Sequence, residues 1–537
     1  PVARLPREGW WRSRRAKRNE IEDGEHLRLP APTSDGEIYV WISKGNTFGR
    51  YPIREIVPEQ GVVRFDMGGD SRTLSDGDRY WLENRVEWIR EPGDWAVAKV
   101  EDGYRLTICA KSPDSLADVE VVLGEGSLIA GRKVHDVVIE GLGIYGAARD
   151  GVEIMEGERV VVRRCGAWEC GRTGISLRAV KQGTVEGCVA WWNGAGISIS
   201  YSDGVVIRRC DAGYNNVDGL LVTWQSRNVD VVENCSHHHL RWGHPDNVQL
   251  YRDVANVRFQ RNLFLAGGQT IMMEEAEKLT FEENAFIGCA ANMLIFGHGN
   301  ARDADITRNT FLCPGYSCMS LTARDYRVFE NIFMTGHAGI AYSVRGVPGY
   351  QADRNLFWAS VRATSPRIMA TDAGWLGDFE AVQRSTGQDA SSHYGDPEFR
   401  HAPIAFAVLD SKRLTECTHA TVVLRAGAEM FRVGDHVEFD FDGVARVVES
   451  VDGDKLTIDP PLDVLPVKSM LVANWGESRS VALDIRPTET SPALHMGKGG
   501  ETIGAALDVQ AYLRGDFDGD GEPDRFPTPF ELGIASR

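Results

Sequence analysis

The stretch NLFLAGGQTIMMEEAEKLTFEENAF, residues 262–286, contains one complete copy of the repeat that decides the fold. Its opening tripeptide Asn-x-Phe occurs five times between residues 262 and 357, at steps of 22 to 25 residues. The five copies are Asn262-Leu263-Phe264, Asn284-Ala285-Phe286, Asn309-Thr310-Phe311, Asn331-Ile332-Phe333 and Asn355-Leu356-Phe357. Self-similarity at a fixed short period is the signature of a solenoid.

Upstream of these copies, a cysteine stands in a similar place in each repeat. The four residues are Cys165, Cys188, Cys210 and Cys235, which extends the repeat to about nine coils. We interpret them as a buried ladder of free thiols. Because neighbouring rungs of a sheet lie about 4.8 Å apart, a disulfide between two of them is one alternative, and a set of metal ligands is another.

Each coil carries two short stretches in which apolar and polar residues alternate, such as residues 174–177 and 205–207. Period-two alternation is typical of half-buried strands. Coils this short leave no room for a crossover helix, and parallel crossovers are almost always right-handed. The sequence therefore predicts an all-β protein, a right-handed parallel β-helix of about nine or more coils.

The flanking regions lack the repeat and divide the chain into five predicted parts. We expect two inserted small β-barrel or sandwich domains, because short alternating strands and Gly- and Asp-rich turns follow one another there. The parts are an N-terminal segment 1–29, an inserted β-domain 30–110, the β-helix 111–400, a second inserted β-domain 401–480 and a C-terminal segment 481–537.

Composition excludes several classes of function. The formal net charge of −18 argues against a nucleic-acid partner, and no run of 18 apolar residues is present to span a membrane. We expect a monomer. The sequence starts at Pro1 without a methionine, and we expect a secreted or periplasmic protein whose signal peptide has been removed.

Two aspartates occupy the same slot on neighbouring coils. Asp218 and Asp246 each stand two residues before the first inward aliphatic, so we expect them about 5 Å apart on an outward groove. Paired carboxylates are typical of acid–base or nucleophilic catalysis in glycosidases. The alternative is that each aspartate bonds only the backbone of its own turn.

The loop before Asp246 contains four of the thirteen histidines, of which His244 is nearest to the carboxylate. Histidine is the usual acid or base near neutral pH, so we expect His244 to tune or orient the aspartates. A metal site formed by His237, His239, His244 and Asp246 is the alternative, although the spacing matches no zinc signature.

Glu274 lies on the next coil after Asp246, at the far end of the strand. Five positions along a straight strand separate it from the aspartate slot by roughly 16 Å. We predict a general acid there, or a solvated strand end. The predicted catalytic residues are thus Asp218, Asp246, Glu274 and His244. The predicted substrate-binding residues are Glu153, Arg178, Trp224, Trp242, Gln249, Tyr251, Gln269 and His298.

The C-terminal segment contains a loop with calcium-binding spacing. Oxygen ligands stand at positions 1, 3, 5 and 9, with glycine at position 6. The ligands would be Asp516, Asp518, Asp520 and Asp524. Position 12 is Pro527 instead of the usual glutamate. We predict a structural Ca²⁺ ion and no cofactor for catalysis, with a metal-free Asp/Gly turn as the alternative.

These motifs resemble carbohydrate-active right-handed β-helix enzymes over most of the chain. Residues 215–219 and 245–247 are similar to the aspartate motifs of polygalacturonases, although Gln269 stands where that family has its catalytic histidine. Residues 271–284 resemble the segment that carries the acid/base glutamate of β-helix exo-glycosidases with an inserted β-domain, whose nucleophile would fall near Tyr251.

The resemblance implies a glycoside hydrolase that cleaves a plant or algal polysaccharide or oligosaccharide. A polysaccharide lyase or uronate epimerase is an alternative, which the scarcity of cations in the outward slots disfavours. A non-catalytic glycan-binding solenoid is a third possibility, because repeats form long binding faces without chemistry.

Overall fold

The computed structural model describes residues 3–7, 10–29, 36–42, 47–110, 112, 125–239, 245–297, 301–336, 340–363, 367–468 and 470–534. Contacts divide the chain into two units. The first contains residues 1–123, 412–422 and 461–467, and the second contains residues 124–411, 423–460 and 468–537. In the described residues, neither α-helix approaches the length needed to cross a membrane.

The first unit is built on an antiparallel sheet and a separate hairpin. Its buried core includes Ile38, Val40, Phe65 and Leu82. The strands of the sheet are β1 (Arg4–Leu5), β2 (Trp11–Arg12), β3 (Arg15–Lys17), β4 (Glu20–Glu22), β5 (Glu37–Ile42), β6 (Thr47–Val57), β7 (Val62–Phe65) and β8 (Arg79–Glu83). The hairpin consists of β9 (Trp95–Val100) and β10 (Gly103–Ile108).

The first 29 residues do not form a separate segment. Strands β1 and β2 pair with β8, and β4 pairs with β7, so this end of the chain completes the sheet of the predicted insert 30–110. Ile21 is fully buried in that core. The boundary expected at residue 29 therefore falls inside one folded unit.

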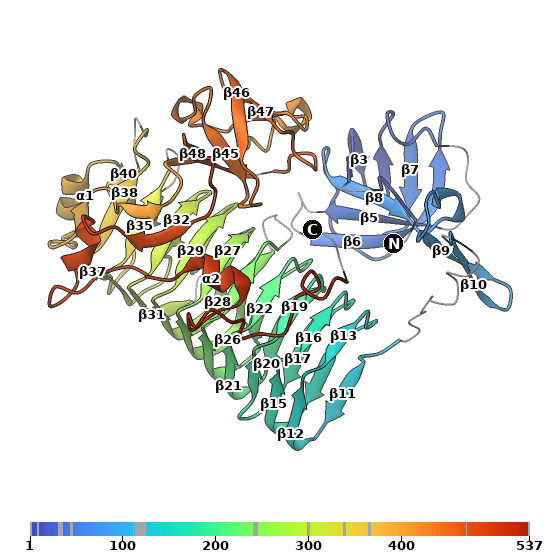
Figure 1. The fold of residues 1–537 in the computed structure, drawn as a ribbon, viewed down its shortest axis with the longest axis horizontal. Coiled ribbons are helices and arrows are strands. Elements are labelled where there is room, and N and C mark those ends of the chain that lie inside the picture. The colour runs from blue at the N-terminus through green and yellow to red at the C-terminus, as the bar shows by residue number, and fades with distance from the viewer. Residues whose placement is uncertain are drawn as a thin grey trace. The chain divides into compact units, whose positions relative to one another are not determined.

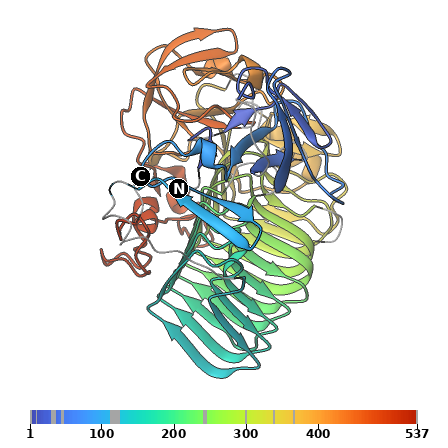
Figure 2. The same cartoon turned by 90° about the vertical axis from the view of Figure 1, so that its right-hand side faces the viewer.

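The second unit contains a parallel solenoid whose successive coils stack strand upon strand (Figures 1 and 2). One sheet begins with β11 (Ile129–Arg132) and β12 (His135–Glu140) and continues through β36 (Ile340–Ser343) to β37 (Gln351–Asp353), β39 (Met369–Thr371) and β40 (Gly374–Leu376). A second sheet runs from β13 (Gly143–Tyr145) to β38 (Leu356–Ala359) and ends with β41 (His393–Tyr394). The site strands of the first sheet are β14 (Val152–Met155), β17 (Thr173–Arg178), β20 (Ala195–Ser200), β23 (Leu220–Thr223), β26 (Asp246–Gln260), β28 (Gln269–Glu282) and β30 (Asn292–Ile295).

The Asn-x-Phe repeat forms two internal ladders, as predicted. The phenylalanines stack with ring centroids 4.7 to 5.3 Å apart, from Phe264 to Phe357. Each asparagine is fully buried and its Oδ1 accepts hydrogen bonds from the asparagine of the preceding coil. The ladder consists of Asn234, Asn262, Asn284, Asn309, Asn331 and Asn355. These amides satisfy backbone groups that a closed turn would otherwise bury unpaired.

The cysteine ladder has three members rather than four. The Cys210 backbone N–H donates to Asn234 Oδ1, so the cysteines occupy the asparagine slot itself. Cys235 pairs in register with Asp211 and lies one residue off the ladder. All four thiols are free and buried, which fits the interpretation as core residues rather than a disulfide.

Two further parts complete the second unit. The antiparallel sheet within residues 401–480 includes β43 (Ala405–Val408), β45 (His436–Phe439), β46 (Arg446–Asp452), β47 (Lys455–Asp459) and β48 (Leu471–Gly476). Helix α1 (Phe379–Thr386) follows the last coils. The C-terminal segment, with α2 (Val509–Arg514), runs back along the coils: the Ala505 N–H donates to Thr310 Oγ1, and the Phe526 N–H donates to the Gly187 carbonyl.

Candidate functional site

Asp218 and Asp246 lie on consecutive coils, as the register predicts. Asp218 stands just before β23 and Asp246 is the first residue of β26, and these two strands pair in parallel. The Asp246 backbone N–H donates a 2.9 Å hydrogen bond to Asp218 Oδ1. Both residues are buried, however, with exposed fractions of 2% and 0%. The expected outward groove is therefore wrong for this slot, because the side chain turns inward at the corner to satisfy a backbone donor.

Asp150 shows that the same slot has a structural use. Its Oδ1 accepts a 3.0 Å hydrogen bond from the Thr173 backbone N–H one coil later, as Asp218 does from Asp246. Asp246 breaks this pattern. It pairs in register with Gln269, but neither of its carboxyl oxygens has a hydrogen-bond partner among the described residues. Asp246 is therefore the carboxyl in this slot that the fold does not use.

The two carboxyls are strongly coupled. Burial raises the pKa of Asp218 to about 7, against a smaller opposing effect of the Asp246 N–H. Burial, and then the charge of Asp218, raise the pKa of Asp246 well above its ordinary value. A buried pair of carboxylates cannot hold two negative charges cheaply. The pair therefore retains at least one proton near neutral pH, which a general acid requires.

The described histidines do not converge on Asp246. The His239 ring lies with Nε2 2.9 Å from Ser236 Oγ, and burial lowers its pKa to about 3. His237 lies with Nε2 3.0 Å from Asp211 Oδ1. The alternative of a metal site combining these histidines with Asp246 is thus not supported.

Asp211 is a buried charged residue that sequence reasoning missed. Its carboxylate accepts a 2.8 Å hydrogen bond from Trp191 Nε1 and lies 3.0 Å from Arg525 Nε. Burial opposes ionisation, but His237 and Arg525 hold the pKa of Asp211 below its ordinary value. Asp211, Cys235 and His237 offer ligand atoms within 4.8 Å of one another. The ion pair with Arg525, far away in sequence, gives the cluster a structural role in holding the C-terminal segment.

At the opposite end of the same strands, three aromatic side chains line successive turns. We call Tyr201, Trp224 and Tyr251 the aromatic turn ladder. The Tyr201 and Trp224 rings stack with centroids 5.9 Å apart and an interplanar angle of 15°, and Tyr251 meets Trp224 edge-on at 5.7 Å. Tyr201 and Trp224 are 42% and 38% exposed. Both have positive φ, a left-handed conformation that bulky residues seldom adopt.

Two arginines cover the aromatic turn ladder. The Arg178 guanidinium lies 5.2 Å from the centroid of Tyr201, and Arg252 lies 4.9 Å from Trp224 and 5.0 Å from Tyr251. Glu274 is partly exposed and pairs in register with Tyr251 on the next coil. Sequence reasoning selected Arg178, Trp224, Tyr251 and Glu274 for this face but missed Tyr201. Tyr201 directly follows Ser200, the last residue of β20, and this position at the turn could have predicted it.

Comparison with known proteins agrees with the fold. The family model described as "Right handed beta helix region" matches residues 121–241. The chain contains a right-handed β-helix. No curated protein matches the sequence significantly.

Solved β-helix structures resemble the chain at low identity. An alginate lyase from Paenibacillus sp. str. FPU-7 is 11% identical, with 41% of this chain and 94% of that chain covered and a TM-score of 0.31. The catalytic unit of an α-1,3-glucanase from Streptomyces thermodiastaticus is 11% identical, with 72% and 88% covered and a TM-score of 0.30. The surface adhesin PfbA of Streptococcus pneumoniae is 12% identical, with 46% and 75% covered and a TM-score of 0.27.

The remaining predicted binding residues are spread along the β-helix. Gln249 is half-buried on the outward face, two residues before Tyr251. Gln269 lies beside Asp246, and its Oε1 has no partner within the described residues. Glu153 lies several coils from the aspartate pair and accepts a 2.7 Å hydrogen bond from Ser127 Oγ on the neighbouring coil. The predictions for Trp242, His244 and His298 fall outside the described residues.

The predicted register slips by one residue on the coil after Glu274. The repeat spacing predicts Ala291 in the slot of the aspartates, but Asn292 pairs with Ser317 and lies there. The same spacing predicts Phe296 on the outward face, whereas its side chain is fully buried and packs against Tyr326 with ring centroids 4.8 Å apart. A shift of one residue in the register exchanges the two faces of a strand. The observed register buries the large apolar ring of Phe296, which the repeat spacing would have exposed.

Three of the four predicted calcium ligands come together. Carboxylate oxygens of Asp516, Asp518 and Asp524 lie within 4.8 Å of one another, whereas Asp520 Oδ1 accepts a hydrogen bond from the Glu522 N–H. The Arg209 guanidinium lies 3.0 Å from Asp518 and 2.9 Å from Asp524. The three oxygens fit a hard cation, and Arg209 already supplies part of the positive charge that the loop needs.

Proposed function

We propose that the protein is a glycoside hydrolase that binds a plant or algal polysaccharide or oligosaccharide across the aromatic turn ladder. The ladder is the observation that carries the proposal. It presents aromatic rings on three consecutive coils, and solvent reaches two of them over about 40% of their surface. Exposed aromatic rings at regular spacing match the apolar ring faces of a sugar chain.

The guanidinium groups and Glu274 add polar partners along the same face. Arg178 and Arg252 border the rings, and Glu274 follows Tyr251 on the next coil. Stacking arginines keep their N–H donors free at the ring edge, where sugar hydroxyls would accept hydrogen bonds. A polysaccharide lying along the coils would thus meet both apolar and polar groups at each step.

For the bond-breaking step we propose the Asp218–Asp246 pair. One protonated carboxyl would donate its proton to the leaving glycosidic oxygen, and the ionised partner would act as base or nucleophile. The raised pKa values of the pair support this division of roles. Asp246 is fully buried and lies five positions along β26 from Tyr251, at the other end of the strand from the aromatic turn ladder. The proposal therefore requires a substrate-bound state in which the sugar chain extends from the ladder to this carboxyl and water reaches it.

Substitution of the central ring tests the binding face. We expect Trp224→Ala to weaken polysaccharide binding about 30-fold, because truncating an aromatic anchor costs about 2 kcal/mol or more. Trp375→Ala is the matched control, since Trp375 is also exposed, at 43%, and also covered by arginines. Titration calorimetry on the first polysaccharide bound by the wild type measures the effect. Equal affinities for the two variants would remove the ladder from the proposed binding face.

The burial of both aspartates favours a second candidate, a non-catalytic glycan-binding solenoid. The two candidates differ in turnover. A screen of polysaccharides by reducing-end release, with the products examined by NMR, separates them: a hydrolase releases saturated oligosaccharides, and a binding protein releases none. Unsaturated products with ultraviolet absorbance would instead indicate a lyase, for which Arg178 and Arg252 would neutralise a uronate.

We also propose that the C-terminal loop binds a structural Ca²⁺ ion. We expect added calcium to raise the melting temperature by a few degrees, since a ligand at hundredfold excess over Kd stabilises by about 2.7 kcal/mol. A chelator should reverse the shift, and Asp516→Asn should abolish it. Asp520→Asn is the control, because Asp520 lies outside the group of three carboxylates. A melting temperature that does not respond to calcium would show that Arg209 alone satisfies the loop.

A further inference from the structure

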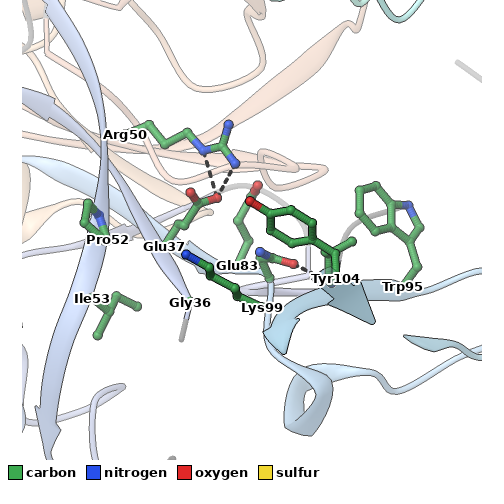
Figure 3. Close-up of a pocket in the computed structure, with 11 residues that line it drawn as sticks. Gly36, Glu37, Arg50, Pro52, Ile53, Glu83, Trp95, Lys99 and Tyr104 are labelled. Atoms are coloured by element: carbon green, nitrogen blue, oxygen red, sulfur yellow. Dashed lines mark hydrogen bonds and ion pairs between the residues drawn. The ribbon is translucent and has the colours of Figure 1, made fainter. Parts of the chain in front are cut away.

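The first unit contains a cavity of about 580 Å³ between its sheet and the β9–β10 hairpin (Figure 3). Its volume falls within the range of roughly 300–1,000 Å³ that is typical of small-ligand sites. The proposed β-helix function makes no use of it. The cavity is lined by the start of β5, the middle of β6 and the end of β8 on one side, and by one face of the hairpin on the other.

The hairpin presents two aromatic rings and an ammonium group to the cavity. Trp95, Val97 and Lys99 alternate along β9 and therefore share a face, and Tyr104 on β10 pairs in register with Lys99. Trp95 is 36% exposed and Tyr104 is 75% exposed. Within the described residues, neither the Lys99 ammonium nor the Tyr104 hydroxyl forms a hydrogen bond or ion pair. These groups are thus available to a ligand.

The sheet contributes a pair of carboxylates on directly opposed residues. Glu37 on β5 pairs in register with Glu83 on β8, which places their Cβ atoms about 5 Å apart. Arg50 Nε donates to Glu37 Oε2 at 2.8 Å, and Trp81 Nε1 donates to Glu83 Oε2 at 2.7 Å. Each carboxylate is therefore held in place by a neighbour that binds one of its oxygens. Burial raises the pKa of Glu83 above its ordinary value.

The hairpin is anchored to the sheet, so the two sides of the cavity keep a fixed spacing. The Val97 backbone N–H donates a 2.8 Å hydrogen bond to Asn84 Oδ1, directly after β8. Two residues earlier on the same strand, the Ala3 N–H donates to the Trp95 carbonyl at 2.7 Å. A cavity with fixed walls binds without a large ordering cost.

The charges lining the cavity identify the class of ligand. Two carboxylates (Glu37 and Glu83) face two cations (Arg50 and Lys99), so the formal charge of the lining is zero. A polyanion or a phosphate would meet the carboxylates, and a cation would meet Arg50 and Lys99. A neutral ligand with many hydroxyls and an apolar face satisfies all of them, because hydroxyls both donate and accept hydrogen bonds.

We propose that this cavity is a binding site for a neutral sugar residue, stacked on Trp95 or Tyr104 and hydrogen-bonded by Glu37, Glu83 and Lys99. The first unit would thus carry a carbohydrate-binding site of its own, separate from the aromatic turn ladder on the β-helix. Figure 3 shows Lys99 and Tyr104 extending from the hairpin towards Glu37 and Glu83. Paired carboxylates accept hydrogen bonds from vicinal hydroxyls, and the ring contact contributes apolar burial.

Titration of the full-length protein with glucose, xylose, galactose and cellobiose tests this site, with glucuronate as the charged comparator. We expect saturable binding of at least one neutral sugar by calorimetry or saturation-transfer NMR, and weaker binding of glucuronate. Tyr104→Ala and Glu37→Gln should each raise Kd at least about tenfold. Tyr104 is 75% exposed, so its removal leaves the fold of the unit intact.

Two controls separate this site from the one proposed on the β-helix. Tyr316→Ala removes another exposed tyrosine, 45% accessible, in the second unit, and should leave sugar binding unchanged. Trp224→Ala weakens the proposed binding at the aromatic turn ladder, so titration of this variant with the monosaccharides isolates the site in the first unit. The proposal is overturned if no neutral sugar binds at millimolar concentrations, or if binding survives both Tyr104→Ala and Glu37→Gln. Failure of polysaccharide hydrolysis alone would not affect it.

Discussion

Replacing Asp246 with asparagine is expected to reduce hydrolysis at least about a thousandfold in kcat without unfolding the protein. General acid–base catalysis by one positioned carboxyl contributes roughly 10²–10⁴ in rate, and an amide cannot exchange the proton. The asparagine has nearly the same volume, and Asp246 has no hydrogen bond from its side chain to lose among the described residues. Initial rates of reducing-end release measure the effect.

The matched control is Asp230→Asn on the exposed surface of the β-helix. Asp230 is 42% exposed and pairs with Arg258 at 3.0 Å on the next coil. Asp230→Asn makes the same chemical change as Asp246→Asn. We expect no loss of activity, since exposed ion pairs contribute little to the stability of the fold. If Asp246→Asn hydrolyses as fast as Asp230→Asn, the buried pair has no part in the reaction.

The raised pKa values of the aspartate pair should make both the stability and the activity of the wild type depend on pH. The pKa of Asp218 is raised to about 7 in the folded protein from an unfolded value near 3.8, so the folded state holds more protons between these values. Stability therefore falls as pH rises through that window. Burial and the charge of Asp218 raise the pKa of Asp246 as well, so Asp246 adds a loss of the same sign. Asp246→Asn removes the contribution of Asp246, and we expect the variant to be more stable than the wild type at about pH 8 but not at about pH 4. Wild-type activity should decline above neutral pH as Asp218 loses its proton.

The second large effect concerns the fold itself: Asn284→Ala should lower the free energy of unfolding by about 3–5 kcal/mol. Asn284 Oδ1 accepts bonds from the Asn262 N–H and Nδ2, and Asn284 Nδ2 donates to the Phe259 carbonyl at 3.0 Å. The alanine leaves these groups buried without partners, at about 1–3 kcal/mol for each unsatisfied group. Urea unfolding followed by circular dichroism measures the difference.

Asn216→Ala provides the comparison, because Asn216 is exposed and its side chain has no hydrogen bond within the described residues. We expect its unfolding free energy to stay within about 0.5 kcal/mol of the wild type. A loss below about 1 kcal/mol for Asn284→Ala would mean that the amide ladder is not a main source of stability.

The repeat made the fold predictable, since five copies of Asn-x-Phe fix the period and the stacking of Phe264 to Phe357. The same register correctly placed Asp218 next to Asp246. It could not give the direction of these side chains, because the backbone at a turn does not follow strand alternation. Phe296 broke the register where burial of a large ring outweighed the repeat spacing.

Long-range partners were beyond the reach of the sequence. His237 and Arg525 hold the pKa of Asp211 below its ordinary value. Arg525 lies on the C-terminal segment, more than 300 positions after Asp211 in the sequence. The sugar cavity of the first unit likewise depends on Glu37 meeting Glu83 across paired strands. Neither contact can be recognised from the local sequence, because several strands separate the two partners along the chain.

The proposed function has two parts: the β-helix binds a polysaccharide on the aromatic turn ladder, and Asp246 takes part in its cleavage. Steady-state kinetics of reducing-end release, on the first polysaccharide that the wild type cleaves, test both parts in one assay. The account predicts that Trp224→Ala raises KM with a smaller change in kcat, and that Asp246→Asn loses kcat. Unchanged kinetics in both variants would contradict it.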